Sequence, residues 1–387
     1  MEIFGLFLYW SGIALCFPCA FLLIEVAAGI LSLGKSSRQP LLEGCPEALL
    51  LIPAHNEQAL LGEMLDRLAA AAQGQEVHTI VIADNCTDDT AAIAHAAGVE
   101  VWERSDNTLR GKPYALAWAL DRLHTNPPQV VVFLDADSWF EKGHPALLAS
   151  FAVASQRPVQ GIYRMADSGL RGFAFRFRNE ARLRGLNALG APVQLTGSGF
   201  AVPWDLLRAH PVPVGELVED AFWGWTFTKN GVGPLLATEV EVLSHLPESK
   251  EGVQTQLRRW EHGILSATLR SLPGLLRSAW WPPRPHRIFH FMDVMVPPLA
   301  LLGLSILLCL LLSIIAGGGA VALPCAVALS LLAMAVFLGW WAYGRAELPF
   351  LRLLAAPFYA LGKVGNYLFF LFRRQKGWDR TERDGDE

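Results

Sequence analysis

We predict an α/β domain with a mainly parallel sheet, flanked by transmembrane and interfacial helices, from three observations. The chain is 52% hydrophobic and its mean hydropathy is +0.31, which is high for a soluble enzyme. Three uncharged stretches are each long enough to cross a bilayer. Between the first and the second, short apolar runs alternate with helical patterns. The chain therefore combines an α/β domain with a membrane part.

The three spans are predicted at 3–24, 294–316 and 319–343. The last two are joined by the Gly-rich turn AGGGA, so we expect them to form a hairpin. The first is not expected to be a cleaved signal peptide, because Glu2 precedes it, its apolar run is too long and no A-x-A site follows. A buried core helix is the alternative for this stretch.

The distribution of Lys and Arg predicts the orientation in the membrane. Lys35 and Arg38 follow the first span, and Arg284 and Arg287 precede the second. The N-terminal residues and the AGGG turn carry no basic side chain. We therefore expect an integral protein of the plasma or inner membrane, with its N-terminus outside and its α/β domain in the cytoplasm.

The segment 345–387 follows the third span and carries basic residues at both ends of an apolar stretch. Lys363 lies in the middle of that stretch, 350–372. This pattern favours an amphipathic helix in the membrane interface, followed by a cytoplasmic tail. A fourth span over the same residues stays open.

Charge and cysteine content limit the partners. The net charge is −4 and no domain is strongly basic, which argues against nucleic acid. The basic residues gather at the predicted membrane edges, so membrane lipids are the expected partner. The six cysteines show no metal or disulfide spacing, and Cys16 and Cys19 lie inside the first span as small apolar residues.

Four apolar runs in the cytoplasmic segment have the pattern of buried strands. They are predicted at 48–56, 77–85, 99–105 and 129–137. Helices are predicted between them at 57–72, 91–97 and 112–123. Because the strands are apolar throughout and alternate with helices, they indicate a parallel sheet covered on both faces.

Polar residues follow three of these strands, in AHNE, ADNCTDD and DADS. In a parallel sheet, ligands bind beyond the carboxyl ends of the strands. Asp88 and Asp89 are explained by capping of the next helix. Turn chemistry does not require acids at both Asp135 and Asp137, so this pair indicates a site.

The spacing of Asp135 and Asp137 indicates a divalent metal. In an extended chain, such residues point to the same side with Cα atoms about 6 to 7 Å apart. Two carboxylates so placed repel each other unless a cation joins them. Mg²⁺ bound by one or two carboxylates fills its other positions with water and substrate phosphates. The pair therefore also indicates a substrate that carries a diphosphate.

Seven short motifs occur in order: LIPAHNE, VIADNCTDDT, RGKPYAL, FLDADS, LTGSGF, LVED and QLRRW. Together they resemble membrane-embedded family 2 glycosyltransferases, which include the cellulose, hyaluronan and poly-N-acetylglucosamine synthases and, more distantly, ceramide glucosyltransferase. The resemblance spans about 48–265 and the flanking spans. It implies a GT-A domain at 45–250 after an N-terminal span at 1–34. The motif helix and interfacial helices then occupy 251–288, before the hairpin at 289–344.

The resemblance assigns residues to the donor side of this site. It implies that Asp84 contacts the uracil of a UDP-sugar and that Glu57 helps to hold the nucleoside. Lys112 would meet the diphosphate, with an ordinary surface role in a helix as its alternative. Asp137 would be the direct ligand of Mg²⁺ or Mn²⁺. Asp135 would be a second ligand, or would face the ribose or a metal-bound water.

The resemblance also assigns the acceptor side. Asp220 in LVED matches the base that deprotonates the acceptor hydroxyl, and its neighbour Glu219 is a second candidate. Gln256, Arg259 and Trp260 match Q-x-x-R-W, whose residues line the acceptor side and the pyrophosphate. At i, i+3 and i+4 they share one helix face. An interfacial helix with a snorkelling Arg and a Trp at headgroup depth explains the same pattern.

Two further features keep both a functional and a structural interpretation. Gly197 and Ser198 in TGSGF resemble the loop near the acceptor, but a plain turn has the same composition. His245 in SHLPES is a candidate ligand for the metal or a phosphate, although a lone His is often a structural or surface residue.

We therefore expect an inverting hexosyltransferase that uses a UDP-hexose or UDP-N-acetylhexosamine and a glycan acceptor in polysaccharide synthesis for the cell envelope. Three spans leave a lipid acceptor open, as in glycolipid synthesis, and a partner for export also stays open. A non-catalytic membrane scaffold would have lost Asp137, Asp220, Arg259 or Trp260, and all four are present. A transporter is disfavoured because the predicted spans contain no paired ionisable residues.

Overall fold

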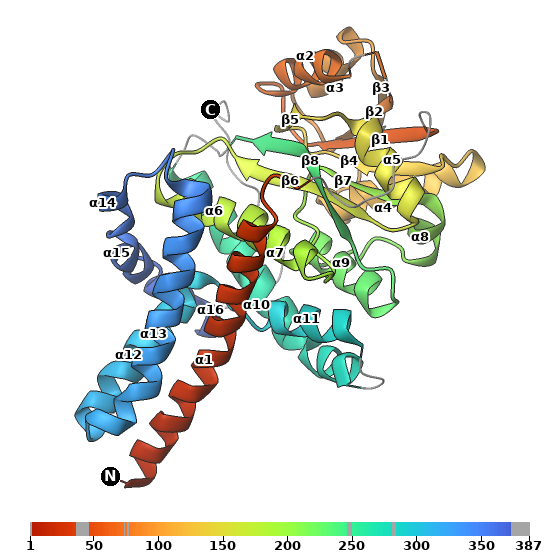
Figure 1. Cartoon of the computed structure of the whole chain (residues 1–387). Coiled ribbons are helices and arrows are strands. Elements are labelled where there is room, and N and C mark those ends of the chain that lie inside the picture. Colours follow the sequence, from red (N-terminus) through yellow and green to blue (C-terminus); the bar gives the residue numbers. More distant parts are fainter. Residues whose placement is uncertain are drawn as a thin grey trace. The chain divides into compact units, whose positions relative to one another are not determined.

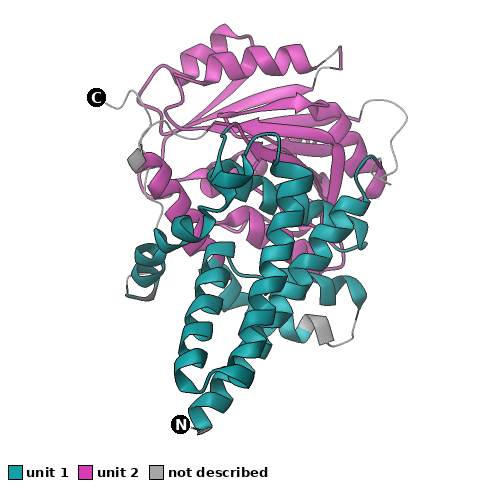
Figure 2. Cartoon of the chain, turned by 60° about the vertical axis from the view of Figure 1, so that its left-hand side comes forward, with its two compact units in different colours: residues 1–34, 167–191, 265–375 teal, residues 35–166, 192–264, 376–387 magenta. Residues whose placement is uncertain are grey.

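The computed structural model describes residues 2–35, 46–72, 74–75, 77–245, 250–280 and 284–372. The chain forms two compact units, coloured separately in Figure 2. Unit 1 comprises 1–34, 167–191 and 265–375, and unit 2 comprises 35–166, 192–264 and 376–387. Arg38 and the basic run from 373 onward, which entered the orientation and tail predictions, lie outside the described residues.

Unit 2 is an α/β domain built on an eight-stranded sheet of order β3-β2-β1-β4-β7-β6-β8-β5 (Figure 1). The strands are β1 (Ala48–Ala54), β2 (His78–Asp84), β3 (Glu100–Arg104), β4 (Val130–Phe133), β5 (Ser138–Lys142), β6 (Val159–Met165), β7 (Phe200–Pro203) and β8 (Leu235–Ser244). Strands β1 to β4 pair in parallel, as do β6 and β8. β7 runs antiparallel to β4 and β6, and β5 to β8. The prediction of a mainly parallel α/β sheet is confirmed.

The helices of unit 2 connect these strands. They are α2 (Leu61–Ala71), α3 (Thr90–Ala96), α4 (Lys112–Arg122), α5 (Pro145–Ser155), α8 (Trp204–Ala209) and α9 (Glu219–Lys229), with a 3-10 turn at Leu123–Thr125. Helix α10 (Lys250–Trp280) belongs to unit 2 up to residue 264 and to unit 1 beyond it.

The core of unit 2 packs α4 and α9 with the sheet. Helix α4 buries one stripe at helical spacing, namely Ala115, Leu116, Ala119 and Leu120. These side chains join one apolar cluster with residues of the sheet and of α9, among them Leu51, Ile82, Phe133, Phe200, Trp223 and Phe227. The rings of Phe133 and Phe200 stack with centroids 4.7 Å apart. This packed core therefore holds the carboxyl ends of the strands in fixed positions.

Unit 1 is helical. It contains α1 (Glu2–Leu31), α6 (Leu170–Arg176), α7 (Leu183–Ala188), α11 (Pro285–Val294), α12 (Leu299–Ala316), α13 (Gly319–Gly339), α14 (Phe350–Leu353), α15 (Ala356–Leu361) and α16 (Val364–Phe372). Two π-helical turns, Phe177–Arg182 and Trp340–Gly344, extend α6 and α13. Within the described residues, three helical stretches are long and apolar enough to cross a membrane: Ile3–Leu31, Leu299–Ala316 and Gly319–Gly344.

One predicted boundary in unit 1 is wrong, that of the second apolar helix. The first apolar helix, α1, contains the uncharged stretch 3–24 and continues through Glu25 to Leu31, inside the predicted range 1–34; Arg182 pairs with the Glu25 carboxylate at 2.8 Å. The second does not begin at Val294, which is the last residue of α11. Pro297 and Pro298 follow, and α12 begins only after them, since proline cannot continue a helix from the preceding turn.

The segment 350–372 forms three short helices, α14 to α16, where the sequence predicted one amphipathic helix. Pro357 stands in the first turn of α15, and its missing N–H interrupts the hydrogen bonds that a continuous helix would need. Leu351, Phe358 and Phe372 on these helices are among the most exposed apolar side chains. None of the three helices alone is long enough to span a bilayer.

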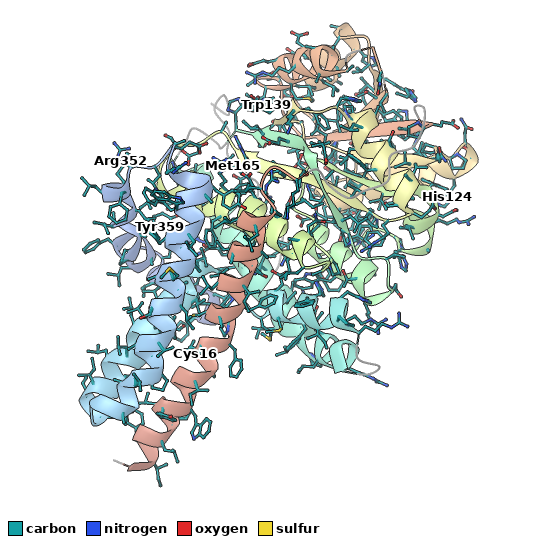
Figure 3. The ribbon with its side chains drawn as sticks, in the orientation of Figure 1. Cys16, His124, Trp139, Met165, Arg352 and Tyr359 are labelled. Carbon is teal, nitrogen blue, oxygen red and sulfur yellow. The ribbon has the colours of Figure 1, made fainter. Side chains whose placement is uncertain are left out.

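Residues 167–191 leave the sheet between β6 and β7 and belong to unit 1. A Cβ on Gly185 would lie 2.0 Å from the Glu25 carbonyl oxygen, so only glycine permits this approach to α1. Arg182 donates from Nε to Glu25 at 2.8 Å and from Nη2 to Asp293 Oδ1 at 2.5 Å. One buried guanidinium thus joins α1, the π-helical turn and α11. In the same unit, Cys16 donates from Sγ to the Pro324 carbonyl at 3.3 Å and serves in helix packing (Figure 3).

Candidate active site

Lys112 lies at the centre of the candidate site in unit 2. It opens α4, and its Nζ donates to Asp135 Oδ1 at 2.5 Å and to the Gly197 carbonyl at 2.6 Å. The Glu219 carboxylate lies 3.9 Å away. Although burial opposes it, the charges of Asp135 and Glu219 raise the pKa of Lys112. Lys112 is therefore a charged member of an ionic cluster and not an ordinary surface lysine.

The loop of TGSGF joins this cluster. The Asp135 N–H donates to Ser198 Oγ at 3.0 Å, and Ser198 is fully buried. A Cβ on Gly197 would lie 3.3 Å from Asp220 Oδ2, so the Asp220 carboxylate lies against this loop. The structure thus brings together the predicted diphosphate lysine, one acid of the D-x-D pair and the predicted base.

Glu219 and Asp220 occupy the first turn of α9. The positive end of the helix dipole favours carboxylates there. Burial and the neighbouring Asp220 raise the pKa of Glu219 to about 7, against the opposing effect of Lys112. Burial also raises the pKa of Asp135. Three carboxyl groups therefore share one lysine, and a cationic ligand would favour their ionised forms.

Asp137 lies in a turn and not on an extended strand. Strand β4 ends at Phe133, because the chain must reverse there to enter β5 at Ser138. The Ser138 hydroxyl donates to Asp137 Oδ1 at 3.2 Å, and the Asp137 carbonyl accepts from the His245 N–H at 3.4 Å. The extended geometry that we assumed for the D-x-D pair is therefore wrong, since Asp135 turns to Lys112 and Asp137 lies next to His245.

The His245 ring packs on an aromatic side chain beside Asp137. Pairing of β5 with β8 sets Ser138 opposite Ser244, so the next residue, His245, reaches the turn. Its ring centroid lies 4.6 Å from that of Trp139, which Figure 3 labels. The Arg67 guanidinium carbon stands 4.5 Å from the Trp139 ring centroid. The exposed His245 imidazole is thus positioned by its contact with the Trp139 ring.

The donor atoms at this edge fit a divalent ion that keeps open positions. Within the described residues, no group of three or more His, Cys, Asp and Glu side chains is arranged around one metal position. Asp137 and His245 are joined through their backbones, so a carboxylate and an imidazole come from adjacent backbone positions, and Asp135 Oδ1 is held by Lys112. A metal with few protein ligands completes its coordination with water and substrate phosphates. Asp137 is therefore better placed than Asp135 to bind it.

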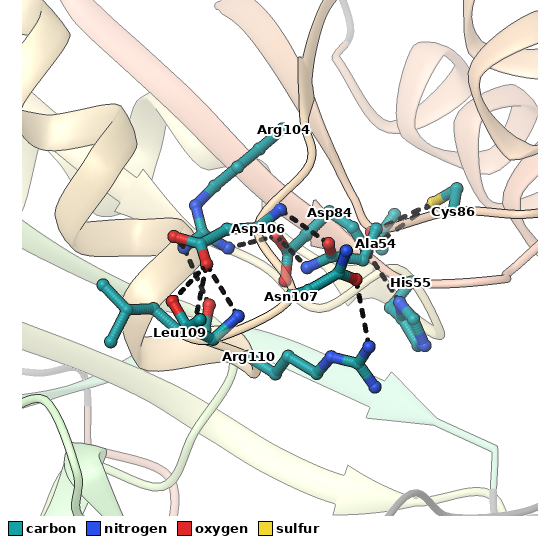
Figure 4. A network of polar contacts seen from close by, with 11 residues as sticks. Ala54, His55, Asp84, Cys86, Arg104, Asp106, Asn107, Leu109 and Arg110 are labelled. Atoms are coloured by element: carbon teal, nitrogen blue, oxygen red, sulfur yellow. Dashed lines mark hydrogen bonds and ion pairs between the residues drawn. The ribbon is translucent and has the colours of Figure 1, made fainter.

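Asp84 is held in a network at the ends of β2 and β3 (Figure 4). The two strands pair in register at Asp84 and Arg104, and Arg104 Nη1 donates to Asp84 Oδ1 at 2.5 Å. Arg104 Nη2 donates to the Leu109 carbonyl at 2.7 Å and to Asp106 Oδ2 at 3.2 Å. Both Asp84 and Arg104 are buried. Arg104 was not among the predicted site residues, because its pairing with Asp84 depends on β2 and β3 being neighbours in the sheet.

Glu57 lies on the same edge, in the loop after β1. It is buried, and its N–H donates to Thr90 Oγ1 at 2.8 Å. Asp88 Oδ1 accepts from the Thr90 N–H at 3.1 Å at the start of α3, and its other oxygen accepts from the Gln58 N–H. The capping interpretation thus holds for Asp88. For Asp89 the structure shows no side-chain cap hydrogen bond.

Gln256, Arg259 and Trp260 lie on α10, one to two turns before Gly263. Residue 263 is seven, four and three positions after them, so all four share a helix face. A Cβ on Gly263 would lie 2.7 Å from Val218 Cγ1, directly before α9. The face of the Q-x-x-R-W motif is therefore turned toward the start of the helix that carries Asp220.

A family model supports the assignment that these residues suggest. The model described as "Glycosyltransferase like family 2" matches residues 46–263, more than half of the chain. The protein belongs to glycosyltransferase family 2. The matched range includes all the site residues above, from Glu57 to Trp260. A search of curated proteins by sequence found no match for this family 2 protein.

Solved structures similar to this family 2 glycosyltransferase include two transferases. A mannosyltransferase, PcManGT from Pyrobaculum calidifontis, solved with GDP-Man and Mn²⁺, matches with a TM-score of 0.65 at 16% identity, over 95% of this chain and 100% of that chain. Glucosyl-3-phosphoglycerate synthase from Mycobacterium tuberculosis, solved with Mn²⁺ and UDP-glucose, matches with a TM-score of 0.41 at 22% identity, over 57% and 79%. The first of these likenesses shows a shared GT-A fold.

Proposed function

We propose that the protein is an inverting hexosyltransferase that moves a sugar from a nucleotide sugar to an acceptor hydroxyl at a membrane. The observation that carries this proposal is the convergence of Lys112, Asp135 and Asp220 on the loop at Gly197. A cation for the leaving diphosphate and a carboxylate for the attacking hydroxyl then lie against the same loop. Membership of glycosyltransferase family 2 supports the reaction class.

In this mechanism the acceptor oxygen attacks the anomeric carbon while the bond from that carbon to the diphosphate breaks. Asp220 takes the proton of the acceptor hydroxyl. Lys112 and Arg259 stabilise the negative charge that develops on the leaving nucleoside diphosphate. Attack on the face opposite the leaving group inverts the anomeric configuration. Gln256 and Trp260 would contact the acceptor.

We propose Mg²⁺ or Mn²⁺ as the cofactor, with Asp137 and His245 as its ligands. The ion would supply Lewis-acid stabilisation of the diphosphate. The similar transferases were solved with Mn²⁺, which supports the choice of metal. The surplus of carboxylates around Lys112 is consistent with a bound cation.

The donor base is proposed to lie against Asp84 and Glu57, as the resemblance implied for a UDP-hexose or UDP-N-acetylhexosamine. The Asp84 carboxylate can accept from the N3–H of uracil, and it can equally accept from the N–H groups of guanine. PcManGT was solved with GDP-Man, so GDP-mannose belongs in the same test.

We propose that α1, α12 and α13 span the membrane, with unit 2 in the cytoplasm and the N-terminus outside. Each of these helices is long and apolar enough by composition. Helices α14 to α16 would lie in the interface. They expose Leu351, Phe358 and Phe372, while the Lys363 ammonium stands 5.1 Å from the Tyr359 ring centroid.

For the acceptor we propose a growing glycan of the cell envelope, with a lipid acceptor as the second candidate. The described residues contain three helices that could span a membrane, and this small number leaves room for a lipid acceptor reached at the membrane surface, which keeps the lipid as the second candidate. The test uses the full chain in lipid nanodiscs with membrane extract and radiolabelled UDP-glucose, UDP-N-acetylglucosamine or GDP-mannose. If the protein transfers sugar, we expect release of nucleoside diphosphate and incorporation of the label into a product. Label in the organic extract indicates a glycolipid, and label in the aqueous extract indicates a polymer. Donor binding without any transfer would instead support a scaffold.

A further inference from the structure

Gln160 is a fully buried amide in the centre of the sheet that the mechanism above does not use. It lies on β6, opposite Phe200 of β7. Its Oε1 accepts from the Thr196 N–H at 2.9 Å. Its Nε2 donates to the carbonyls of Ser198 at 2.9 Å and Gly199 at 3.1 Å. One side chain therefore binds the backbone of loop 196–199 at both ends.

These contacts fix the orientation of the amide. The acceptor oxygen faces an N–H, and Nε2 also lies 3.0 Å from the Gly161 carbonyl. A flipped amide would place its oxygen against three carbonyls. Only the observed orientation satisfies the buried polar groups on both sides.

Loop 196–199 is held mainly through its backbone, in which the Gly199 N–H also donates to the Phe133 carbonyl at 2.9 Å and the Gly199 carbonyl accepts from the Gly161 N–H at 2.8 Å. Gly197 and Gly199 adopt φ values of +95° and +67°, which side chains other than glycine rarely allow. A Cβ on Gly199 would lie 2.6 Å from Val242 Cγ2. Two of the four positions therefore have no side chain with which to anchor the loop, and the Gln160 amide supplies that anchor.

The same loop contacts three of the groups in the proposed active site. The Gly197 carbonyl accepts from Lys112, the Ser198 hydroxyl accepts from the Asp135 N–H, and Gly197 limits the position of Asp220. A change in this loop would displace the cation and the base together.

We propose that Gln160 is a positioning residue that fixes loop 196–199 and, through it, the relative placement of Lys112 and Asp220. This inference rests on the proposed function. Replacement of the amide lowers kcat, because a misplacement of about 1 Å can cost roughly a hundredfold in rate. The KM for the donor changes less than kcat, because the proposed nucleoside contacts at Asp84 and Glu57 lie outside these hydrogen bonds.

The test compares Gln160→Met, which removes both hydrogen-bonding functions, with Gln160→Glu, which keeps the shape. When protonated, the new carboxyl can accept from Thr196 and donate to Ser198. When it ionises, it loses the donor and faces carbonyl oxygens. We expect the kcat of Gln160→Glu, relative to wild type, to be near one at low pH and to fall as pH rises. The same ratio for Gln160→Met should be low and independent of pH.

Gln156→Met is the matched control, because Nε2 of that exposed amide donates to the Val153 carbonyl of its own helix. Hydrogen exchange of the peptide 194–200 supplies a readout that does not depend on turnover. We expect faster exchange there in Gln160→Met than in wild type or Gln156→Met. Unchanged exchange, or equal pH profiles for the two Gln160 variants, would overturn the inference. A wild-type protein that transfers no sugar would sink the proposed function, while the exchange result would still decide the role of Gln160.

Discussion

At the scale of single residues, Arg104 is the hydrogen-bonded ion-pair partner of the buried Asp84 carboxylate. Its guanidinium is shared among Asp84, Asp106 and the Leu109 carbonyl. We predict that Arg104→Met weakens nucleotide-sugar binding roughly tenfold to a hundredfold, because charge-assisted hydrogen bonds of this kind contribute about 1.5–3 kcal/mol. Calorimetric titration of the donor measures this. Arg208→Met, which breaks only an exposed pair with Asp205, should bind like wild type. If Arg104→Met binds the donor as tightly as wild type, Asp84 does not need its ion pair with Arg104 for donor binding.

The two acids of the D-x-D pair have different neighbours and should respond differently to mutation. Asp137 lies beside His245, whereas Asp135 is paired with Lys112. We predict that Asp137→Ala abolishes the effect of Mn²⁺ on donor binding. Asp135→Ala should weaken binding but retain a response to Mn²⁺. Titration of each variant with and without the metal checks this division, which complete loss of the response in both variants would refute.

Part of the site could be predicted from the sequence at the level of single residues. Asp84, Lys112 and Asp135 follow buried strands or open a helix at one edge, and the structure places them there. Arg104 and Gln160 could not be selected in the same way. An arginine at the end of a strand or a glutamine within one has no special spacing. Their roles depend on which strands are neighbours, and that is set by tertiary pairing.

At the scale of elements, the buried group of Glu25, Arg182 and Asp293 joins three segments of unit 1. We predict that Arg182→Met lowers the free energy of unfolding by about 3–5 kcal/mol, because two buried carboxyl groups lose their shared cation. Thermal unfolding in detergent measures the change. Arg171→Met removes a more exposed ion pair with Asp167 and should have little effect. If both variants unfold at the same temperature, the buried group does not stabilise unit 1.

The elements that the sequence did not predict share a physical cause. The first four strands pair in parallel, and helices connect them along the chain. Their apolar runs can therefore be recognised from neighbouring residues in the sequence. Strand β7 has only four residues, Phe200–Pro203, and strand β8 pairs with β5 and β6, which lie far from it in the sequence. Between β6 and β7 the chain passes through 167–191, which packs with α1. Such long-range pairings leave little trace in a window of neighbouring residues.

At the scale of the whole molecule, composition and motif order predicted the main features. The mainly parallel α/β domain, the three apolar helices and membership of glycosyltransferase family 2 agree with the structure and the family model. The division into polysaccharide or glycolipid synthesis depends on acceptor contacts that neither composition nor motif spacing encodes.

The most direct test of the central claim is the transfer rate of Asp220→Asn, measured in nanodiscs with labelled donor and compared with Glu219→Gln. We predict that Asp220→Asn lowers turnover by at least about a hundredfold, since it removes the general base, while donor affinity stays near that of wild type. Glu219→Gln should retain most of the activity. A wild-type rate in Asp220→Asn, or a loss of turnover confined to Glu219→Gln, would contradict the assignment of Asp220 as the base.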